Sequence, residues 1–286
     1  MKNAIIMIGQ PDSGKSNYLA RAWEDIRSGT AALSLVDGEN IEYLEELLSH
    51  LFYGKFAPRS DKNIEQSRHD IKLTVRTSDS DESVKLVVPD VTGELWKGAV
   101  ANSDLPEEWM HSLEEATGAL MFLRVGSEEN QQPLDWVASR RLLSILGSQG
   151  AEVAIPTQVV YSELLRFLQT RLGKRHAGAH RKVAIVITAW DRLDPEYRER
   201  PPMDFIRKEF PLLAGRIENI SDLEIKLFGI SVVGGDLDAD QNFRAHFQSG
   251  DIKDFGYTVV QEEDGAISQK RDVTLPLSWF MGGYGG

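Results

Sequence analysis

Cysteine is absent from this chain of 286 residues. Its absence excludes disulfide bonds, thiolate metal ligands and thiol nucleophiles. Also missing is any run of about eighteen apolar residues, so no transmembrane helix is expected. Residues 1–4 lead straight into an apolar stretch and lack the pattern of a secretory leader. Together these absences predict a cytoplasmic protein that does not cross a membrane.

Positive charge is scarce as well. Lysine and arginine number 32 against 44 aspartates and glutamates, which gives a formal net charge of −12. General binding to nucleic-acid backbones needs a positive field, so that class of partner is excluded. Binding of a single phosphorylated ligand is not excluded, because a nest of backbone N–H groups holds phosphates even on an acidic protein.

Apolar runs alternate with stretches of helical periodicity along the chain. This alternation predicts an α/β fold: a doubly wound, mostly parallel sheet of about six strands with helices on both faces. The runs typical of strands are 4–8, 32–36, 70–77, 83–89, 119–123, 183–188 and 225–231, with 70–77 and 83–89 as a hairpin. Helices are expected at 15–27, 41–52, 135–146, 161–172 and 203–210.

The length suits one large domain, and we expect residues 1–286 to form a single one. Residues 124–180 are more than the strand–helix alternation needs, so they are expected to form a helical insertion. Residues 281–286 are rich in glycine and are expected to be a flexible tail.

Residues 9–16 read G-Q-P-D-S-G-K-S and match the phosphate-loop pattern G-x-x-x-x-G-K-[ST] in full, between a predicted strand and a predicted helix. Gly9 and Gly14 permit the tight turn that points backbone N–H groups at phosphates. Lys15 is expected to reach the β- and γ-phosphates, and the Ser16 hydroxyl to bind Mg²⁺. The positive end of the helix dipole adds to the attraction. The other residues assigned to this site are Asp12, Ser13 and Asn17.

A second motif, D-V-T-G-E at residues 90–94, follows the apolar run 83–89. Asp90 at the end of a buried strand can hold Mg²⁺ through water, and the N–H of Gly93 can approach the γ-phosphate. Glu94 stands where a water-orienting glutamine is common. It can orient or deprotonate water, but its charge is unfavourable beside the γ-phosphate, so slow intrinsic hydrolysis and stimulation by a partner are expected.

A third motif, T-A-W-D at residues 188–191, ends the run 183–188. The Asp191 carboxylate can accept two hydrogen bonds from the edge of guanine, which adenine cannot supply. A simple helix-capping role for Asp191 is the alternative. Trp190 lies inside the motif, where it could shield a base.

The order of these motifs resembles that of the P-loop GTPases of the Ras and translation-factor class. In this comparison Thr188 stands where an asparagine is usual, Ala189 stands where a lysine is usual, and Asp191 matches. Ser231, with the two valines after it, takes the place of the fifth motif. Asp12 is similar to the aspartate in the phosphate loop of the translation factors.

The chain as a whole also resembles the bacterial double-GTPase domains of multi-gene conflict and defence systems. The resemblance is carried by the phosphate loop, the T-x-x-D motif, the segment G-I-S-V-V-G-G at 229–235 and the ending L-P-L-S-W-F at 275–280. It implies GTP and Mg²⁺ as ligands, protein partners from a multi-gene system, and a nucleotide switch with weak GTPase activity.

Three other functions fit the same motifs. One is a P-loop ATPase in which ATP replaces GTP and Asp191 is only structural. Another is a small-molecule kinase, with Asp37 as the base toward an acceptor hydroxyl. The third is a nucleotide-binding scaffold without catalysis. The hydroxyl that completes the Mg²⁺ shell has three candidates, Thr30, Ser60 and Ser67.

Overall fold

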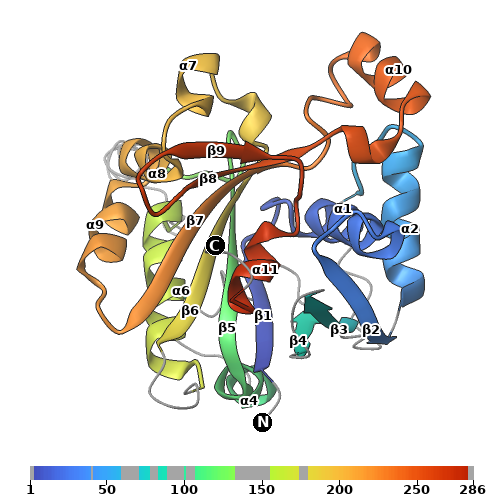
Figure 1. Ribbon diagram of the computed structural model, residues 1–286. Coiled ribbons are helices and arrows are strands. Elements are labelled where there is room, and N and C mark those ends of the chain that lie inside the picture. The colour runs from blue at the N-terminus through green and yellow to red at the C-terminus, as the bar shows by residue number, and fades with distance from the viewer. Residues whose placement is uncertain are drawn as a thin grey trace, which may run out of the picture.

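The computed structural model describes residues 3–39, 41–58, 71–77, 83–88, 100, 107–132, 155–173 and 180–282. These residues contain a nine-stranded sheet with the strand order β2-β3-β4-β1-β5-β6-β7-β8-β9. Helices pack on both faces of this sheet (Figure 1). The expected α/β fold is therefore confirmed.

Five parallel strands form the centre of the sheet, in the order β4-β1-β5-β6-β7. Their bounds are Asn3–Gly9 for β1, Ser83–Val88 for β4, Ala116–Arg124 for β5, Arg181–Thr188 for β6 and Leu223–Ser231 for β7. Strands buried on both faces need near-continuous apolar sequence, which is why these runs stand out in the chain.

Antiparallel strands extend the sheet at both edges. Strands β2 (Leu33–Glu39) and β3 (Ile71–Thr77) lie beyond β4, and strands β8 (Tyr257–Gln261) and β9 (Ile267–Lys270) lie beyond β7. The expectation of about six strands was therefore wrong, because there are nine. A mostly parallel sheet is not confirmed either, since four of the eight strand pairings are antiparallel. The short, partly polar strands β8 and β9 give little apolar signal in the sequence.

Two layers of helices cover the sheet (Figure 1). One face carries α1 (Lys15–Ser28), α2 (Ile41–Phe52), α10 (Gln241–Ser249), the short turn Ile252–Asp254 and α11 (Leu275–Phe280). The other face carries α4 (Glu107–Glu115), α6 (Thr157–Arg171), the turn Trp190–Arg192, α8 (Pro202–Glu209) and α9 (Pro211–Asn219). Helix α7 (Pro195–Arg198) has no buried residue.

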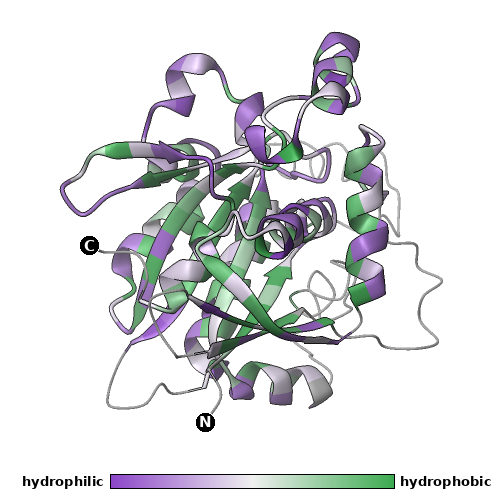
Figure 2. Cartoon of the chain, turned by 45° about the vertical axis from the view of Figure 1, so that its right-hand side comes forward, coloured by the Kyte–Doolittle hydropathy of each residue, from purple (hydrophilic) through white to green (hydrophobic). Residues whose placement is uncertain are grey.

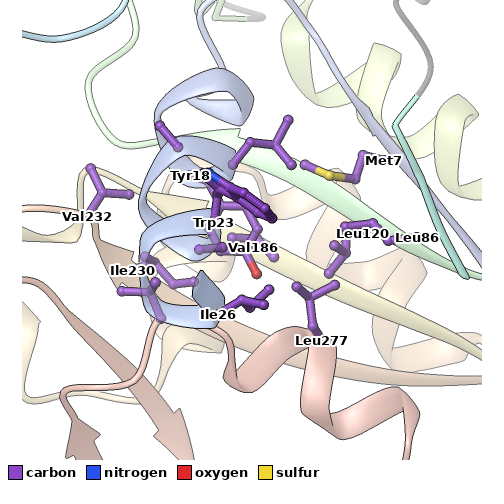
Figure 3. Packing of buried hydrophobic residues seen from close by; sticks show 14 of the residues in the cluster. Met7, Tyr18, Trp23, Ile26, Leu86, Leu120, Val186, Ile230, Val232 and Leu277 are labelled. Atoms are coloured by element: carbon purple, nitrogen blue, oxygen red, sulfur yellow. The ribbon is translucent and has the colours of Figure 1, made fainter. Parts of the chain in front are cut away.

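The two faces of β1 show how the strands build two cores. Ile5 and Met7 enter the cluster under α1 and α11, whereas Ile6 and Ile8 enter the cluster under α4 and α6. This follows from the alternation of side chains along a strand. Figure 3 shows part of the first cluster, in which Trp23 and Leu277 lie with strand residues of the sheet. Figure 2 shows the apolar strands between more polar outer helix surfaces.

Helix α1 carries a buried polar contact as well as its apolar face. The helix begins after Gly14 and ends before Gly29, and both glycines have left-handed backbone angles. Arg21, which is fully buried, pairs with Asp25 and donates a hydrogen bond to the carbonyl oxygen of Phe255 at 3.0 Å. The first helix is thus tied to a segment more than two hundred residues later in the chain.

Several expected elements differ from the observed ones or lie outside the described residues. Helix α6 begins at residue 157 rather than 161. The expected helix 135–146 lies outside the described residues, and so do residues 283–286 of the expected tail. The single domain and its helical insertion therefore stay predictions. Among the helices that the structure describes, none is long and apolar enough to span a membrane.

Candidate nucleotide site

The phosphate loop lies between β1 and α1 and is closely packed. Gly14 has a φ of 84°, and a Cβ added to it would lie 2.6 Å from Thr188 Oγ1. A Cβ added to Gly9 would lie 2.8 Å from Ser13 Oγ. Glycine is therefore needed at both positions, at Gly14 for its backbone conformation as well as for space.

Lys15 points back over this loop. Its Nζ donates hydrogen bonds to the carbonyl oxygens of Gly9 at 2.8 Å and Gln10 at 2.9 Å, and to Ser13 Oγ at 3.0 Å. Burial lowers the pKa of the Lys15 ammonium to about 7, and the negative charge of Asp12 partly opposes this shift. The ammonium is thus held where backbone N–H groups would meet phosphate oxygens, although some surface of the residue stays exposed.

Asp12 is the one described non-glycine residue of the loop with a left-handed backbone, at a φ of 57°. Its carboxylate forms an ion pair with Arg124, the last residue of β5. The same carboxylate accepts a hydrogen bond from Ser127 Oγ at 2.9 Å. The side chain of Asp12 therefore faces the end of β5, whereas its backbone stays in the phosphate loop.

Thr188 joins the third motif to the phosphate loop. Its hydroxyl lies 2.9 Å from the carbonyl oxygen of Ser13 and 3.2 Å from that of Leu123, and the residue is buried. The expected site residue Thr188 thus lies at the site, but its side chain supports the loop from behind. The carboxyl ends of β1, β5 and β6 meet here, as expected for a ligand site in an open parallel sheet.

Asp191 and Ser231 come together at the neighbouring strand ends. The Ser231 hydroxyl hydrogen-bonds to the Asp191 carboxylate and accepts a hydrogen bond from the N–H of Gly234 at 2.9 Å. Tyr257 pairs with Ser231 between β7 and β8. Its pKa is raised mainly by burial and further by the nearby negative charge of Asp191. The third and fifth motifs therefore form one cluster, although they are far apart in sequence.

Trp190 does not lie over a ligand position. The residue is fully buried, and its Nε1 donates to the carbonyl oxygen of Arg198 at 3.1 Å. A Cβ on Gly229 would lie 2.4 Å from its ring, and the Phe205 ring packs edge-on at 6.1 Å. The idea that Trp190 shields a base is therefore wrong, because the turn after β6 directs the indole into the core.

The start of α1 separates two neighbouring residues of the predicted site. Ser16 is partly exposed in the first helical turn, next to Lys15. Asn17 instead accepts a hydrogen bond from the backbone N–H of Ala57 at 2.8 Å, so its side chain holds the chain after α2. Asp90, Gly93 and Glu94 lie outside the described residues.

The hydroxyl of Ser16 is a hard oxygen donor of the type that Mg²⁺ prefers. In the described part of the chain, no group of three or more His, Asp or Glu residues is arranged to hold a metal ion by itself. The residues present fit a Mg²⁺ ion that takes most of its ligands from phosphates and water rather than from a protein cage.

Three residues at the site were not predicted. Arg124 and Ser127 contact Asp12 as described above, and the Tyr161 hydroxyl meets the backbone of Gln10. Burial is the main reason that the pKa of Tyr161 is raised. Arg124 could have been found from the sequence, because it is a basic residue directly after an apolar run whose end is expected at the ligand edge of the sheet. Tyr161 gave none, because its contact depends on how α6 packs.

The chain is similar to several solved structures at low sequence identity. No curated protein sequence matches the chain. The signal recognition particle receptor SRb from Chaetomium thermophilum, solved as SRb-GTP/SRX, is 14% identical, with a TM-score of 0.41 over 87% of this chain and 98% of that one. The GTP-bound Ski7 GTPase-like domain of S. cerevisiae is 12% identical, with a TM-score of 0.42 over 88% and 51%.

A third solved structure, Roco2 RocCORdC of Methanosarcina barkeri bound to GDP, is 12% identical, with a TM-score of 0.33 over 86% of this chain and 47% of that one. The chain spans about half the length of the Ski7 and Roco2 chains. The family comparison is far more specific, because one model matches from β1 to the end of α11, including the phosphate loop, Asp191 and Ser231. With residues 6–280 matched, the chain belongs to the Double-GTPase 1 family.

Proposed function

We propose that the chain binds GTP with Mg²⁺, hydrolyses it slowly and acts as a nucleotide switch within a larger complex of the bacterial cytoplasm, in the setting of a multi-gene defence system. The observation that carries this proposal is the Asp191–Ser231 cluster at the same sheet edge as the phosphate loop. Membership of the Double-GTPase 1 family supports it.

The Asp191 cluster favours guanine for a chemical reason. A carboxylate can accept from both the ring N–H and the exocyclic amino group of guanine, whereas adenine presents an acceptor nitrogen there. Ser231 orients the carboxylate and leaves further lone pairs on it for a base. Hydrogen bonds to a charged group contribute roughly 1.5–3 kcal/mol each. A preference for GTP over ATP of about a hundredfold follows, because about 1.4 kcal/mol corresponds to tenfold.

The metal would be held by Ser16 directly and by Asp90 through water, with the remaining ligands from the phosphates. When bound, Mg²⁺ would neutralise charge on the β- and γ-phosphates. Lys15 would bind the same phosphate oxygens from the loop side. Slow hydrolysis is proposed because Glu94, at its position in the second motif, would place a negative charge near the γ-phosphate. Partner proteins would then be needed for faster hydrolysis.

The position of Asp37, the base of the kinase alternative, argues against that function. Asp37 does not follow β2 but lies within it, exposed at the outer edge of the sheet. Strands β3 and β4 separate β2 from β1. With about 4.8 Å between neighbouring strands, that places Asp37 roughly 14 Å from the strand that leads into the phosphate loop. The ATPase and scaffold functions remain as outcomes of the following experiment.

The test compares GTP with ATP by calorimetry, each with Mg²⁺, on the whole protein. GTP is expected to bind about a hundredfold more tightly. Asp191→Asn should weaken GTP binding at least about tenfold and improve binding of xanthosine triphosphate, whose ring carbonyl accepts from the new amide. Asp222→Asn is the matched control, since Asp222 is an exposed carboxylate paired with Arg181.

Equal affinity for GTP and ATP in the wild-type protein would replace the GTPase proposal with the ATPase one. Lys15→Ala should abolish binding of both nucleotides if binding passes through the phosphate loop. Phosphate release, measured in single turnover on the bound nucleotide, separates a slow enzyme from a scaffold: release above the uncatalysed rate supports hydrolysis, and its absence supports a scaffold.

A further inference from the structure

The turn after β6 carries a large side chain that the proposed function leaves without a role, the indole of Trp190. Trp190 comes directly before Asp191 in the turn Trp190–Arg192. The Asp191 carboxylate contacts Ser231, but this hydrogen bond alone does not fix where the backbone of Asp191 lies. A hydrogen bond to a base forms only when the accepting oxygen lies at the right distance and angle. The contacts that hold the turn therefore matter for the base end of the proposed site.

The indole packs on the same strand that carries Ser231. A Cβ on Gly229 would lie 2.4 Å from the Trp190 ring, so the ring rests directly on β7. Gly229 and Ser231 are two residues apart and face the same side of the strand, about 7 Å from each other. The turn is thus attached to β7 at two points, through the indole at Gly229 and through the Asp191 carboxylate at Ser231. Two points of attachment fix both the position and the direction of the turn.

Hydrogen bonds to Arg198 close the segment that the turn begins. Trp190 Nε1 donates to the carbonyl oxygen of Arg198 at 3.1 Å, and Arg198 Nε donates to that of Leu193 at 2.6 Å. The N–H of Leu193 in turn donates to the carbonyl oxygen of Trp190 at 3.2 Å. The indole is also fully buried, with the Phe205 ring edge-on at 6.1 Å. A shift of the indole therefore disturbs the whole turn.

The backbone at the start of the turn needs this support. Ala189 has a left-handed φ of 55°, which is unfavourable for alanine, and its carbonyl oxygen accepts a hydrogen bond from the N–H of Arg192 at 3.0 Å. Such a conformation persists only where the surroundings hold it. On one side Ala189 follows Thr188, whose hydroxyl is bound to the phosphate loop, and on the other it precedes the anchored indole. Without the indole, the turn can relax, and Asp191 moves with it.

We propose that Trp190 is a positioning residue: its anchored indole fixes the turn that holds the Asp191 carboxylate where a guanine edge can donate to it. The proposal rests on the proposed function, because it assumes that Asp191 accepts from the base. It adds that discrimination between bases depends on a buried side chain that does not touch the base.

The experiment measures the ratio of the affinities for GTP and inosine triphosphate, by calorimetry with Mg²⁺ on the whole protein. Inosine triphosphate lacks only the exocyclic amino group of guanine, so it forms one hydrogen bond to Asp191 instead of two. The wild type is expected to prefer GTP at least about tenfold. A change at the phosphate loop affects both affinities alike, and a loss of folded protein changes the stoichiometry rather than the ratio. The ratio therefore reports the placement of Asp191.

Trp190→Phe removes the indole N–H and part of the ring, and it is expected to lower the ratio at least about threefold. Trp23→Phe is the matched control. Trp23 is 4% exposed and its Nε1 donates to Glu45 Oε1 at 2.8 Å in the core on the other face of the sheet, so a comparable buried indole is lost. This control should keep the wild-type ratio. Gly229→Ala pushes the indole away from β7 and should lower the ratio as Trp190→Phe does.

A folded Trp190→Phe protein whose ratio falls by less than about threefold, or by no more than that of Trp23→Phe, would overturn the proposal. If Trp190→Phe does not fold, Gly229→Ala is judged by the same criterion. A wild type that does not distinguish GTP from inosine triphosphate would overturn the guanine assignment of the proposed function, and this proposal with it. A wild type that does distinguish them, with a ratio that the variants keep, would overturn this proposal alone.

Discussion

The ammonium of Lys15 combines the charge that phosphates need with burial that opposes charge. Its pKa of about 7 lies below the ordinary value of 10.5 because burial disfavours the ion. Since the folded pKa is below the unfolded one, the cost of burying this charge is fully present below pH 7 and is relieved as the pH rises toward 10.5. A bound triphosphate reverses the situation, because its anionic oxygens favour the ammonium.

Nucleotide binding should therefore take up a proton at Lys15. At about pH 8 the terminal phosphate is already ionised, so a net uptake of roughly half to one proton per nucleotide bound is expected at Lys15. The affinity should accordingly fall as the pH rises above 7. Calorimetry in two buffers with different ionisation enthalpies measures the proton directly, and an identical heat in both buffers would contradict the lowered pKa.

Residues were predictable where a local motif specified them. The phosphate loop is recognisable from its own pattern and Asp191 from its place after an apolar run, whereas Thr188 and Ser231 were assigned through the resemblance to GTPases. The structure brings all of them to one edge of the sheet. Arg124 and Ser127 were missed because their partner Asp12 lies 112 and 115 residues away, and only the strand register makes them neighbours. The direction of the Trp190 side chain was likewise unreadable from sequence.

Among the elements, β7 shows how tightly the turn after β6 packs on the sheet. Gly229 of β7 lies directly under the Trp190 ring, at 2.4 Å from where a Cβ would be. Gly229→Ala is expected to destabilise the protein by about 1–3 kcal/mol, because neither the indole nor the strand can retreat. Urea unfolding measures the change.

Gly215→Ala is the control, because it is expected to change the free energy of unfolding in the opposite direction. Gly215 lies inside α9, and an added Cβ would meet no atom within 4 Å. Gly215→Ala should therefore stabilise the protein by about 0.5–1 kcal/mol through helix propensity. Equal effects at the two glycines would contradict the packing of Trp190 on β7.

Elements were predictable in proportion to their burial. The central strands are apolar for most of their length because both faces are covered, so their runs were visible. Strand β9 reads I-S-Q-K and has no buried residue, so its identity as a strand comes from pairing with β8. Strand β2 extends to Glu39, beyond its apolar run, because antiparallel pairing with β3 supports its polar end.

At the scale of the whole molecule, the last helix completes the core. Phe280 of α11 is 4% exposed and lies against Gly118 of β5, where a Cβ would be 2.5 Å from its ring. Phe280→Ala is expected to lower the free energy of unfolding by about 3–5 kcal/mol. The matched control is Phe52→Ala, since Phe52 is 50% exposed. Denaturant titration that shows the same loss for both would contradict a structural role for α11.

The overall architecture was only partly predictable, because strands at the edges of a sheet leave a weaker signal in the sequence than central strands do. General rules for α/β sheets restrict how parallel strands are connected, but they do not fix the order of the central strands. The number of strands did not follow from them either, because the added strands lie at the two edges, where one neighbour is enough and the sequence is less constrained. Long-range contacts such as that of α11 with β5 likewise leave no periodic signal.

During synthesis, α1 leaves the ribosome long before its buried partner exists. The carbonyl that Arg21 binds belongs to Phe255, 234 residues later, and α11 follows later still. Chains are made from the N-terminus at roughly 5–20 residues per second. More than about ten seconds therefore pass between the synthesis of α1 and the synthesis of Phe255, whose carbonyl oxygen Arg21 contacts. A nascent chain that has been made only as far as α10 therefore contains the whole phosphate loop, but α1 still lacks its contact with Phe255. Nucleotide binding is accordingly expected only late in synthesis or after it.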